Sequence, residues 1–474
     1  MESVWIVLLC VAAYMAVLAL ISFLVRRSSG TSASFTTGGK AFPAILIGFL
    51  LASEFIGTTA SVGTAQVAYR SGISAAWNIA VLGIGFILFA WLLAHRFRAL
   101  GESTISGALA RFYGERVRKA TSVLMVCALM TVAVSTYASG GAVLAGLLGI
   151  GKVPAILLVG VAATVYVLIG GMRSVVYTNV LHALVMLVGI GILAAVAIGR
   201  AGGPGNLRIE LPPEFFSVSG VGWSQIFAWM VAGVGAIFAT QYVVQAIATT
   251  PDPHRARIAT LWSAAILIPY GLLASVVGMS AAVIHPGIDP IQALPSLTVD
   301  LPPLVAGFVV AGLAGAIFGT VAAITLGCST LLVKDFLDPA MNRTGDDRRS
   351  VLLLRSATLA VGLLPVLLAV TAEDVVAVTF LAKALRAGLA VLVLLMFFRP
   401  GFGTRTGALT SIFAALVATI GWFLLGNPFG IDNAYVAVAV PMLTMTLFHL
   451  FARRGGPGAP EQPMPEPTTT ERTA

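Results

Sequence analysis

The apolar segments of this chain constrain its fold more than any other feature, because runs of about 20 mostly apolar residues recur along nearly its whole length. One such run crosses the roughly 30 Å hydrocarbon core of a bilayer as a helix. Hydrophobic residues make up 58% of the chain and charged residues only 10%, against roughly 25% charged in soluble proteins. Only helices and closed barrels satisfy the backbone in lipid, and runs this continuously apolar form helices. The sequence therefore predicts an all-α polytopic membrane protein.

The boundaries of the apolar runs predict about thirteen transmembrane helices. They lie at residues 3–25, 41–69, 72–95, 117–148, 153–171, 176–198, 220–246, 258–284, 302–333, 350–371, 374–397, 405–425 and 432–452. We expect residues 1–452 to form a single transmembrane domain. Residues 453–474 are rich in Pro, Glu and Thr and are expected to be a disordered cytoplasmic tail.

The Lys and Arg residues fall in short loops on alternate sides of these spans. If the N-terminus is outside, the outer loops hold only Arg70, Lys152, Arg200 and Arg208, and the other loops hold most of the basic residues. Such a bias predicts an outer N-terminus and an inner C-terminus, in the cytoplasmic membrane of a bacterial cell. The formal net charge of +9 then reflects membrane topology and does not indicate a nucleic-acid partner.

The second and seventh spans carry small and polar residues through their middles. The second contains the run 52–66, and the seventh contains Gly233 and Gly235 followed by Gln241. Paired interruptions in two halves of a chain point to a transporter built from inverted repeats. Spans 2–6 (about 41–198) and spans 7–11 (about 220–397) then form two five-helix units. Because five is odd, the second unit is inverted relative to the first.

Four segments give the chain a resemblance to the sodium:solute symporter family. They are residues 52–72, 101–114, 166–179 and 315–335, which include Tyr166 to Arg173 and an aspartate at the inner end, Asp335. The resemblance covers roughly residues 40–400. It implies sodium-coupled transport of a small solute by alternating access, at a site formed around the broken first core helix.

The chain departs from this family at two places. Many members have an aspartate after the threonine of the 166–179 segment, where this chain has Asn179, and a glutamine three residues on, where it has His182. Members usually offer two adjacent hydroxyl residues to sodium, where this chain has Gly319 and Thr320. One carboxylate and one hydroxyl of the family pattern are therefore absent.

The resemblance implies a sodium site at the broken second span. Sodium is a hard cation that takes oxygen ligands, some of them carbonyls that are freed where a helix unwinds. The matching positions are the backbone carbonyls of Ser53 and Ile56, the hydroxyl of Thr320 and the carbonyl of Gly319. The alternative for Thr320 is a hydrogen bond from its hydroxyl to its own helix.

Glu54 lies near the middle of the second span, where a charge costs at least about 2.5–3.5 kcal/mol. We interpret it as a substrate-binding residue that pairs with a substrate amine. It is also a candidate cation ligand, a proton carrier, a partner of Arg386 or a structural acid.

Lys383 and Arg386 are three residues apart and share one face of the eleventh span. Two cations inside the membrane need an anion, and an Arg side chain binds a carboxylate in bidentate fashion. We predict that both bind an anionic substrate. The alternative is pairing with Glu54, Glu373 or Asp374.

Gln66 and Gln241 are also predicted to bind substrate, because an amide facing lipid would lose its hydrogen bonds. Gln245 lies one turn after Gln241, and for it too two roles are open: binding substrate or capping a broken helix.

The sequence thus predicts a secondary active transporter that imports a small organic acid or amino-acid-like anion with sodium. A proton-coupled symporter that uses Glu54, and a solute receptor on the same fold, are the alternatives. No nucleophile, metal cluster or phosphate loop is recognisable, so an enzyme is not expected. No cofactor is expected besides the coupling ion, and Cys10, Cys127 and Cys328 have no paired spacing.

Overall fold

A computed structural model describes residues 2–25, 42–148, 150–341, 346–371 and 375–454, and every regular element in these ranges is a helix. The long helices are α1 (Glu2–Val25), α4 (Thr58–Ser71), α5 (Trp77–Leu92), α8 (Glu115–Leu148), α9 (Lys152–Arg200), α11 (Trp223–Ala239), α13 (Pro253–Ile284), α15 (Pro303–Leu332), α17 (Asp347–Ala369), α18 (Val375–Phe398), α19 (Arg405–Leu424) and α20 (Asn433–Arg454). The shorter ones are α3 (Ala44–Ser53), η2 (Gly72–Ala76), α6 (Ala94–Leu100), α7 (Ile105–Tyr113), α10 (Gly203–Glu210), η3 (Pro213–Phe216), α12 (Gln241–Ala248), η4 (Pro290–Gln292), α14 (Ala293–Val299), η5 (Val333–Leu337), α16 (Asp338–Met341) and η6 (Pro428–Gly430).

Ten helical segments among the described residues are long and apolar enough to cross a bilayer, or up to eleven if the bent pair α11–α12 is one span. The sequence predicts more because it counts 41–69 and 153–171 as whole spans. In the structure the first is broken after α3, and the second lies in the early part of the 49-residue helix α9, which also contains the predicted span 176–198. The count of thirteen stays a prediction, and residues 455–474 of the expected tail lie outside the described ranges.

The second and seventh predicted spans are both interrupted, as the sequence indicates. Helix α3 ends at Ser53, and α4 begins after Gly57, whose backbone is extended. Helix α11 ends before Thr240, which is also extended, and α12 then continues at an angle of 43°. Local hydroxyl bonds accompany both breaks: Ser53 Oγ donates to the Leu50 carbonyl over 2.7 Å, and Thr240 Oγ1 donates to the Ala236 carbonyl. Side chains of this kind compete with the helical ladder.

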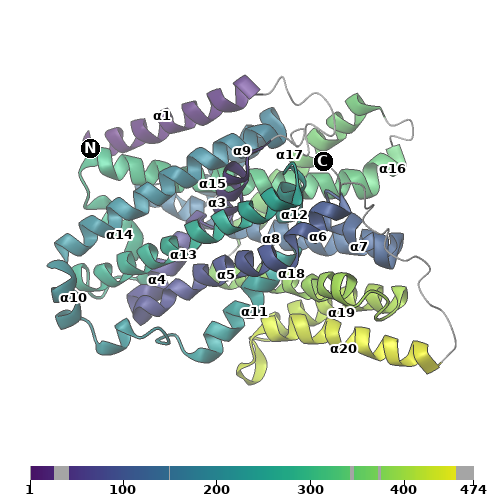
Figure 1. Ribbon diagram of the computed structural model, residues 1–474. Helices are drawn as coiled ribbons and strands as arrows, with labels where there is room; N and C mark the ends of the chain where they lie inside the picture. The colour runs from purple at the N-terminus through teal and green to yellow at the C-terminus, as the bar shows by residue number, and fades with distance from the viewer. Residues whose placement is uncertain (1, 26–41, 149, 342–345, 372–374, 455–474) are drawn as a thin grey trace, which may run out of the picture.

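The long helices run side by side between two ends of the molecule (Figure 1). Helices α10 and α14 lie at one end, called the α10 end, and α6, α7 and α16 lie at the other, called the α7 end. Helix α1 begins at the α10 end and α20 finishes at the α7 end. The start of α1 and the end of α20 therefore lie at opposite ends of the bundle.

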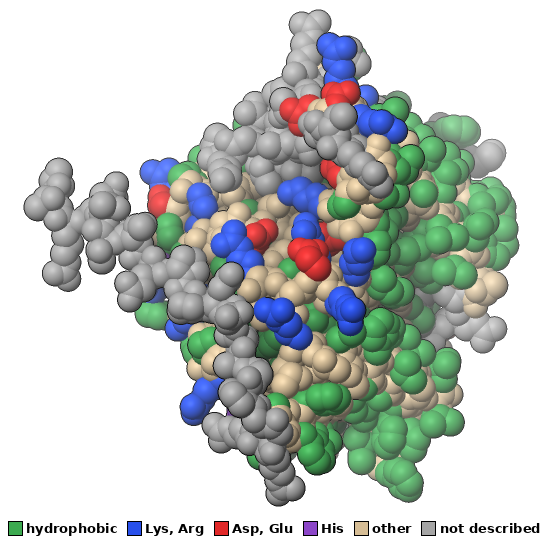
Figure 2. Space-filling model, turned by 90° about the vertical axis from the view of Figure 1, so that its right-hand side faces the viewer, with side chains coloured by type: hydrophobic (Ala, Val, Ile, Leu, Met, Phe, Trp, Pro, Cys, Tyr) green, Lys and Arg blue, Asp and Glu red, His purple; other side chains and the backbone are tan. Residues whose placement is uncertain are grey.

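The surface fits a bilayer. Figure 2 looks onto the α7 end, where Lys and Arg side chains gather with Asp and Glu, while hydrophobic side chains cover the adjoining flank. Large apolar side chains such as Trp5 and Leu9 on α1 and Phe451 on α20 are exposed. Lipid covers these apolar side chains without the free-energy cost that their exposure to water would carry.

Helices from the two predicted repeats pack in corresponding pairs. Helix α5 packs against α13, each being the second member of its unit. The broken α3–α4 packs against α13 and α9, and the bent α11–α12 packs against α5 and α18 in the matching way. Close approach helps here, since a side chain on Gly278 of α13 would overlap the Ala65 carbonyl of α4. The two broken helices are thereby held at the centre, with α1, α19 and α20 outside the two units.

Candidate functional site

A cavity lies beside the break between α3 and α4 and is enclosed by α5, α8, α12, α15 and α18. The empty space there, counted together with adjoining solvent space, is about 720 Å³. Its walls are mostly apolar, and the polar side chains that reach it include Glu54, Asn78, Thr320, Lys383 and Arg386. An apolar cavity with a few convergent polar groups is the usual form of a small-molecule site.

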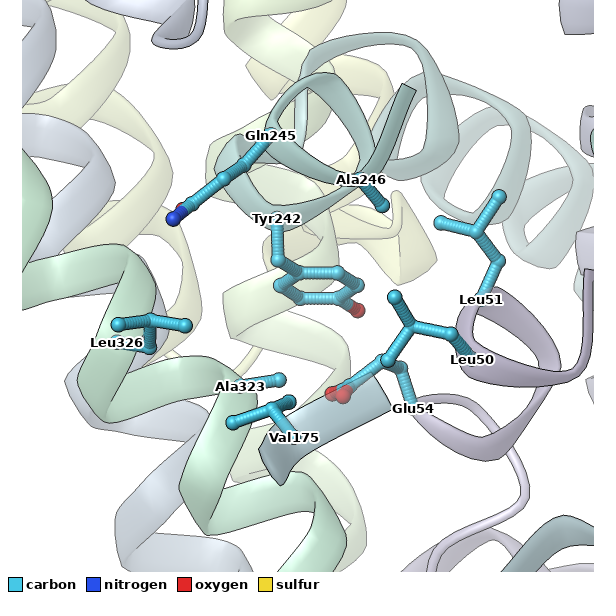
Figure 3. A pocket seen from close by; sticks show the side chains of 9 residues that line it. All are labelled: Leu50, Leu51, Glu54, Val175, Tyr242, Gln245, Ala246, Ala323 and Leu326. Carbon is cyan, nitrogen blue, oxygen red and sulfur yellow. The ribbon is translucent and has the colours of Figure 1, made fainter. Parts of the chain in front are cut away.

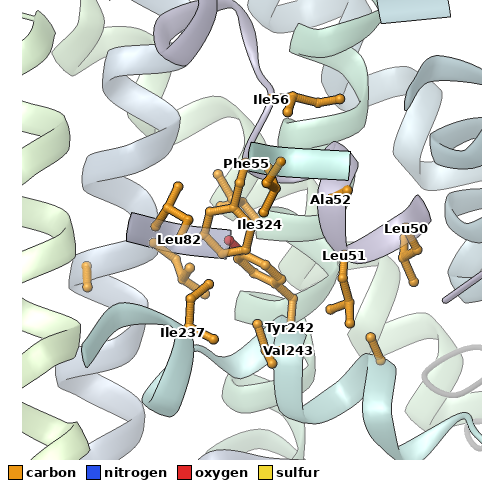
Figure 4. Packing of buried hydrophobic residues seen from close by; sticks show 14 of the residues in the cluster. Leu50, Leu51, Ala52, Phe55, Ile56, Leu82, Ile237, Tyr242, Val243 and Ile324 are labelled. Atoms are coloured by element: carbon orange, nitrogen blue, oxygen red, sulfur yellow. The ribbon is translucent and has the colours of Figure 1, made fainter. Parts of the chain in front are cut away.

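Aromatic side chains fix the wall next to the break. Phe55 meets Phe86 edge-on, with ring centroids 5.5 Å apart, and lies 5.6 Å from the Tyr242 ring of α12. Figure 4 shows Phe55 and Tyr242 packed together with Leu82 and Ile324. The unwound segment is therefore anchored by its own side chain to α5 and α12, which holds the adjoining residues in place.

Glu54 lies in the break and is 7% exposed. It lines the large cavity and also a much smaller one between α3, α9, α12 and α15. Figure 3 shows its carboxyl group pointing toward Val175 and Ala323, beside the Tyr242 ring. Asn179 Nδ2 on α9 lies 3.5 Å from Glu54 Oε1. Among the described residues no Lys, Arg or His lies within 4.0 Å of this carboxylate.

Thr320 faces the break from α15. Its hydroxyl is buried and has no hydrogen-bond partner in the described part of the chain, so the alternative that it bonds to its own helix is not realised. A Cβ on Gly57 would lie 3.0 Å from Thr320 Oγ1, which means that α15 approaches the break closely there. Ser53 and Ile56 are fully buried on either side of Glu54, between the end of α3 and the start of α4.

Lys383 and Arg386 line the large cavity from α18 and are 7% and 3% exposed. Lys383 Nζ donates to Asn78 Oδ1 over 3.3 Å and lies 4.5 Å from the Phe380 ring centroid. Arg386 donates through Nε to the Ala382 carbonyl over 3.0 Å and through Nη1 to Thr240 Oγ1 over 3.2 Å. Neither has a carboxylate within 4.0 Å among the described residues, from which Glu373 and Asp374 are absent.

The two predicted glutamines do not line the cavity. Gln241 accepts a hydrogen bond from the Ile105 N–H over 2.9 Å and donates to the Ser103 carbonyl over 3.2 Å, so its amide holds the start of α7. Gln66 lies farther along α4, and its buried Oε1 has no partner in the described ranges. Tertiary packing thus directs the Gln241 amide toward the α7 end, a direction that span position alone does not reveal.

Other residues at the site are not predicted by the sequence analysis. Asn78 links Lys383 to α4, because its Nδ2 donates to Thr64 Oγ1 over 3.1 Å. Tyr242 lines both cavities. Asn78 gave a signal in the sequence, since it is an amide inside an apolar run, but Tyr242 gave none.

A polar network closes the α7 end. Asp335 lies in the π-helical turn η5, is 3% exposed, and accepts from Arg118 Nε over 2.6 Å. It also accepts from the hydroxyls of Ser106 and Ser122. Together with Gln241 this carboxylate fastens α7 to α8, η5 and α12. The aspartate of the family-like segment is thus a structural anchor at this end.

Comparison with known proteins defines the class. The family model described as "Sodium:solute symporter family" matches residues 35–415. The chain therefore belongs to the sodium:solute symporter family. It is a multi-span transporter of the cell membrane and not an enzyme.

Two relatives are similar in sequence to this chain over most of its length. A high-affinity proline transporter of Bacillus subtilis is 25% identical over 432 residues, 85% of this chain and 89% of that protein. A monocarboxylic acid transporter of Corynebacterium glutamicum is 25% identical over 468 residues, 87% of this chain and 82% of that protein. A substrate-bound, outward-open structure of a Na⁺-coupled sialic acid symporter has a TM-score of 0.83 at 17% identity and covers 96% of this chain and 99% of that one, which shows a shared fold.

The position of Gln241 predicts that Gln241→Leu loosens α7 without weakening solute binding. Two hydrogen bonds are lost, each worth about 0.5–1.5 kcal/mol, so the fraction of molecules in which α7 is displaced rises by roughly 5- to 150-fold. The measurement is the maleimide labelling rate of a cysteine placed at the buried Ala108, after Cys10, Cys127 and Cys328 are replaced.

The matched control is Gln292→Leu, an exposed glutamine of η4. Weaker solute binding with an unchanged labelling rate would instead place Gln241 in the solute site.

Proposed function

We propose that this protein imports a small organic anion, an organic acid or amino-acid-like solute, by sodium-coupled alternating access. The observation that carries this proposal is the pair Lys383 and Arg386, two buried cations that line one cavity and have no carboxylate within 4.0 Å in the described part of the chain. Buried charges need partners, and a solute carboxylate is the partner that matches an Arg fork. A related monocarboxylic acid transporter agrees with this class of substrate.

Sodium is proposed to bind where the broken helix meets α15. The ligands are the carbonyls of Ser53, Ile56 and Gly319 and the hydroxyl of Thr320. The unpartnered Thr320 hydroxyl and its approach to Gly57 support this proposal. The carbonyls of Ser53 and Ile56 lie at the break, outside the regular hydrogen-bonding ladder, and are therefore available to a cation, whereas the Gly319 carbonyl lies within α15.

The proposed topology is thirteen spans with the N-terminus outside and the C-terminus inside, built on two inverted five-helix repeats. The start of α1 and the end of α20 at opposite ends of the bundle support an odd count. The gathering of basic side chains at the α7 end supports that end as the cytoplasmic one. The corresponding packing of α3–α4 and α11–α12 supports the repeats.

The direct test is uptake by the purified protein in liposomes. Small carboxylates, amino acids and neutral solutes are offered under an imposed sodium gradient or an imposed proton gradient. We expect accumulation of an anionic solute only with inward sodium. Proton-driven accumulation that Glu54→Gln abolishes would establish proton coupling instead, and binding without accumulation would establish a receptor.

Arg386→Gln is expected to raise the KM for anionic solutes by at least about tenfold, because one charge-assisted hydrogen bond is worth about 1.5–3 kcal/mol. Neutral solutes should be affected less than about twofold. Initial uptake rates in the same liposomes measure both, with the exposed Arg255→Gln as the control. Equal losses for charged and neutral solutes would mean that Arg386 is structural.

Thr320→Val is expected to raise the sodium concentration for half-maximal uptake by about tenfold, since it removes one ligand with little change of shape. Thr325→Val on the same helix is the matched control, because its hydroxyl already donates to the Val321 carbonyl over 2.6 Å. If both variants respond to sodium as the unmodified protein does, Thr320 is not a ligand.

A further inference from the structure

Two uncharged groups hold the ammonium of Lys383 in the large cavity. Nζ donates to Asn78 Oδ1 over 3.3 Å and lies 4.5 Å from the Phe380 ring centroid. Phe380 is itself stacked on Trp229, with ring centroids 5.7 Å apart and the planes within 13° of parallel, so its ring face has a fixed position. An amide oxygen and a ring face both attract a cation, but neither neutralises it. The charge of Lys383 is therefore held in place and still available.

The orientation of the Asn78 amide follows from hydrogen-bond chemistry. An ammonium only donates, so the amide presents Oδ1 to Lys383 and directs Nδ2 elsewhere. Nδ2 donates to Thr64 Oγ1 on α4 over 3.1 Å. Asn78 and Lys383 are each 7% exposed, and Thr64 is fully buried. Asn78 thus has one fixed orientation and joins α18 to the second half of the broken helix.

A carboxylate in the place of this amide would change the charge and little else. Asp and Asn have nearly the same shape, and the Thr64 hydroxyl can donate to a carboxylate as well as accept from an amide. Lys383 would then have an internal ion pair in a site of low dielectric, where the attraction is strong. That pair would occupy the ammonium that a solute carboxylate needs. The neutrality of position 78 is therefore what leaves Lys383 to the solute.

Arg386 is held in the same way, one turn further along α18. Its Nε donates to the Ala382 carbonyl and its Nη1 to the Thr240 hydroxyl, both of them neutral acceptors. Asn78, Lys383 and Arg386 all line the large cavity. Among these acceptors Asn78 is the one side chain that becomes a carboxylate by the exchange of a single atom. Its identity therefore decides whether one of the two cations has an internal counter-ion.

We propose that Asn78 determines the specificity of this transporter for anions, because it holds the Lys383 ammonium with a neutral oxygen and so keeps the charge for the solute. Asn78 is a positioning residue, since it acts through Lys383 and needs no contact with the solute. This inference rests on the anion transport proposed above. It goes further in naming the residue that makes the site select for charge.

The test is stabilisation of the full-length protein in nanodiscs by carboxylates, in sodium at constant ionic strength. The probes are acetate, pyruvate, succinate and phenylacetate, and each is compared with its uncharged amide. The rise in Tm with probe concentration gives a half-saturation for each compound. We expect the unmodified protein to bind at least one carboxylate at least about tenfold more tightly than its amide, because only the carboxylate pairs with the cations.

Asn78→Asp is expected to raise the half-saturation for that carboxylate by at least about tenfold, because the new side chain pairs with Lys383. The half-saturation for the amide should change by less than about twofold. Tm without probe should not fall, since an ion pair replaces a hydrogen bond. The matched control is Asn433→Asp at a buried asparagine of α20 that does not line the cavity, and it should change neither half-saturation.

A second pair of variants separates positioning from direct contact with the solute. Asn78→Leu removes the acceptor and should raise the carboxylate half-saturation by about fivefold, because the hydrogen bond that fixes the ammonium is lost. In the Lys383→Met protein, which has no ammonium to hold, the addition of Asn78→Leu should change the half-saturation by less than about twofold. If Asn78→Leu fails to fold, Asn78→Asp, which keeps the shape, decides the case.

Each result has a defined meaning. Four results would overturn the inference and leave anion transport intact: unchanged carboxylate binding in Asn78→Asp, equal losses for carboxylate and amide, a lower Tm of Asn78→Asp without probe, or a full effect of Asn78→Leu in the Lys383→Met protein. If no carboxylate stabilises the unmodified protein, the proposed anionic solute is wrong, and the role of Asn78 falls with it.

Discussion

Backbone hydrogen bonds that are lost where a membrane helix unwinds must be replaced inside the bundle, because lipid offers none. Two helices of this protein unwind, α3–α4 before Gly57 and α11–α12 at Thr240, and the packing of both units surrounds them. The cavity, the Glu54 carboxylate and the approach of Thr320 all lie at the first break. The second break carries Tyr242, which closes the cavity, and Gln241, which holds the α7 end. The cavity and the α7 end are thus each attached to irregular backbone, at the first and the second break respectively.

Charge is unevenly divided inside the bundle. Lys383 and Arg386 lie on α18 on one side of the cavity, and Glu54 lies in the break without an ion pair to either among the described residues. Low dielectric makes each uncompensated charge costly, so a bound counter-ion would lower the free energy most at these positions. A transporter that binds an anion beside two cations and a cation beside one acid would neutralise most of this charge during each cycle. The same electrostatics that stabilises the ligands can then favour one conformation over another.

The sequence predicted the helices well where hydropathy and length decide them. Helix α15 (Pro303–Leu332) matches the expected span 302–333, and α8 (Glu115–Leu148) matches 117–148, because desolvation of a long apolar run depends on local composition alone. The interruptions were also visible, since small and polar residues in mid-span weaken a helix wherever it packs. Of the predicted substrate residues, Glu54, Lys383 and Arg386 line the cavity and Gln66 and Gln241 do not, and the binding roles of all five stay predictions.

Which polar groups meet was decided only by the tertiary structure. Asn179 looked in the sequence like a missing carboxylate, and Gly319 like a missing hydroxyl, yet in space the oxygen of one fills the place left by the other. Contacts between α9 and α15 arise from packing of residues 140 positions apart, and no local pattern encodes them. By itself the sequence determined the membrane class, the helices, the broken spans and the family, because these follow from composition and local order. The fold alone decided which side chains share a cavity, because that depends on how helices distant in the chain rotate toward one another.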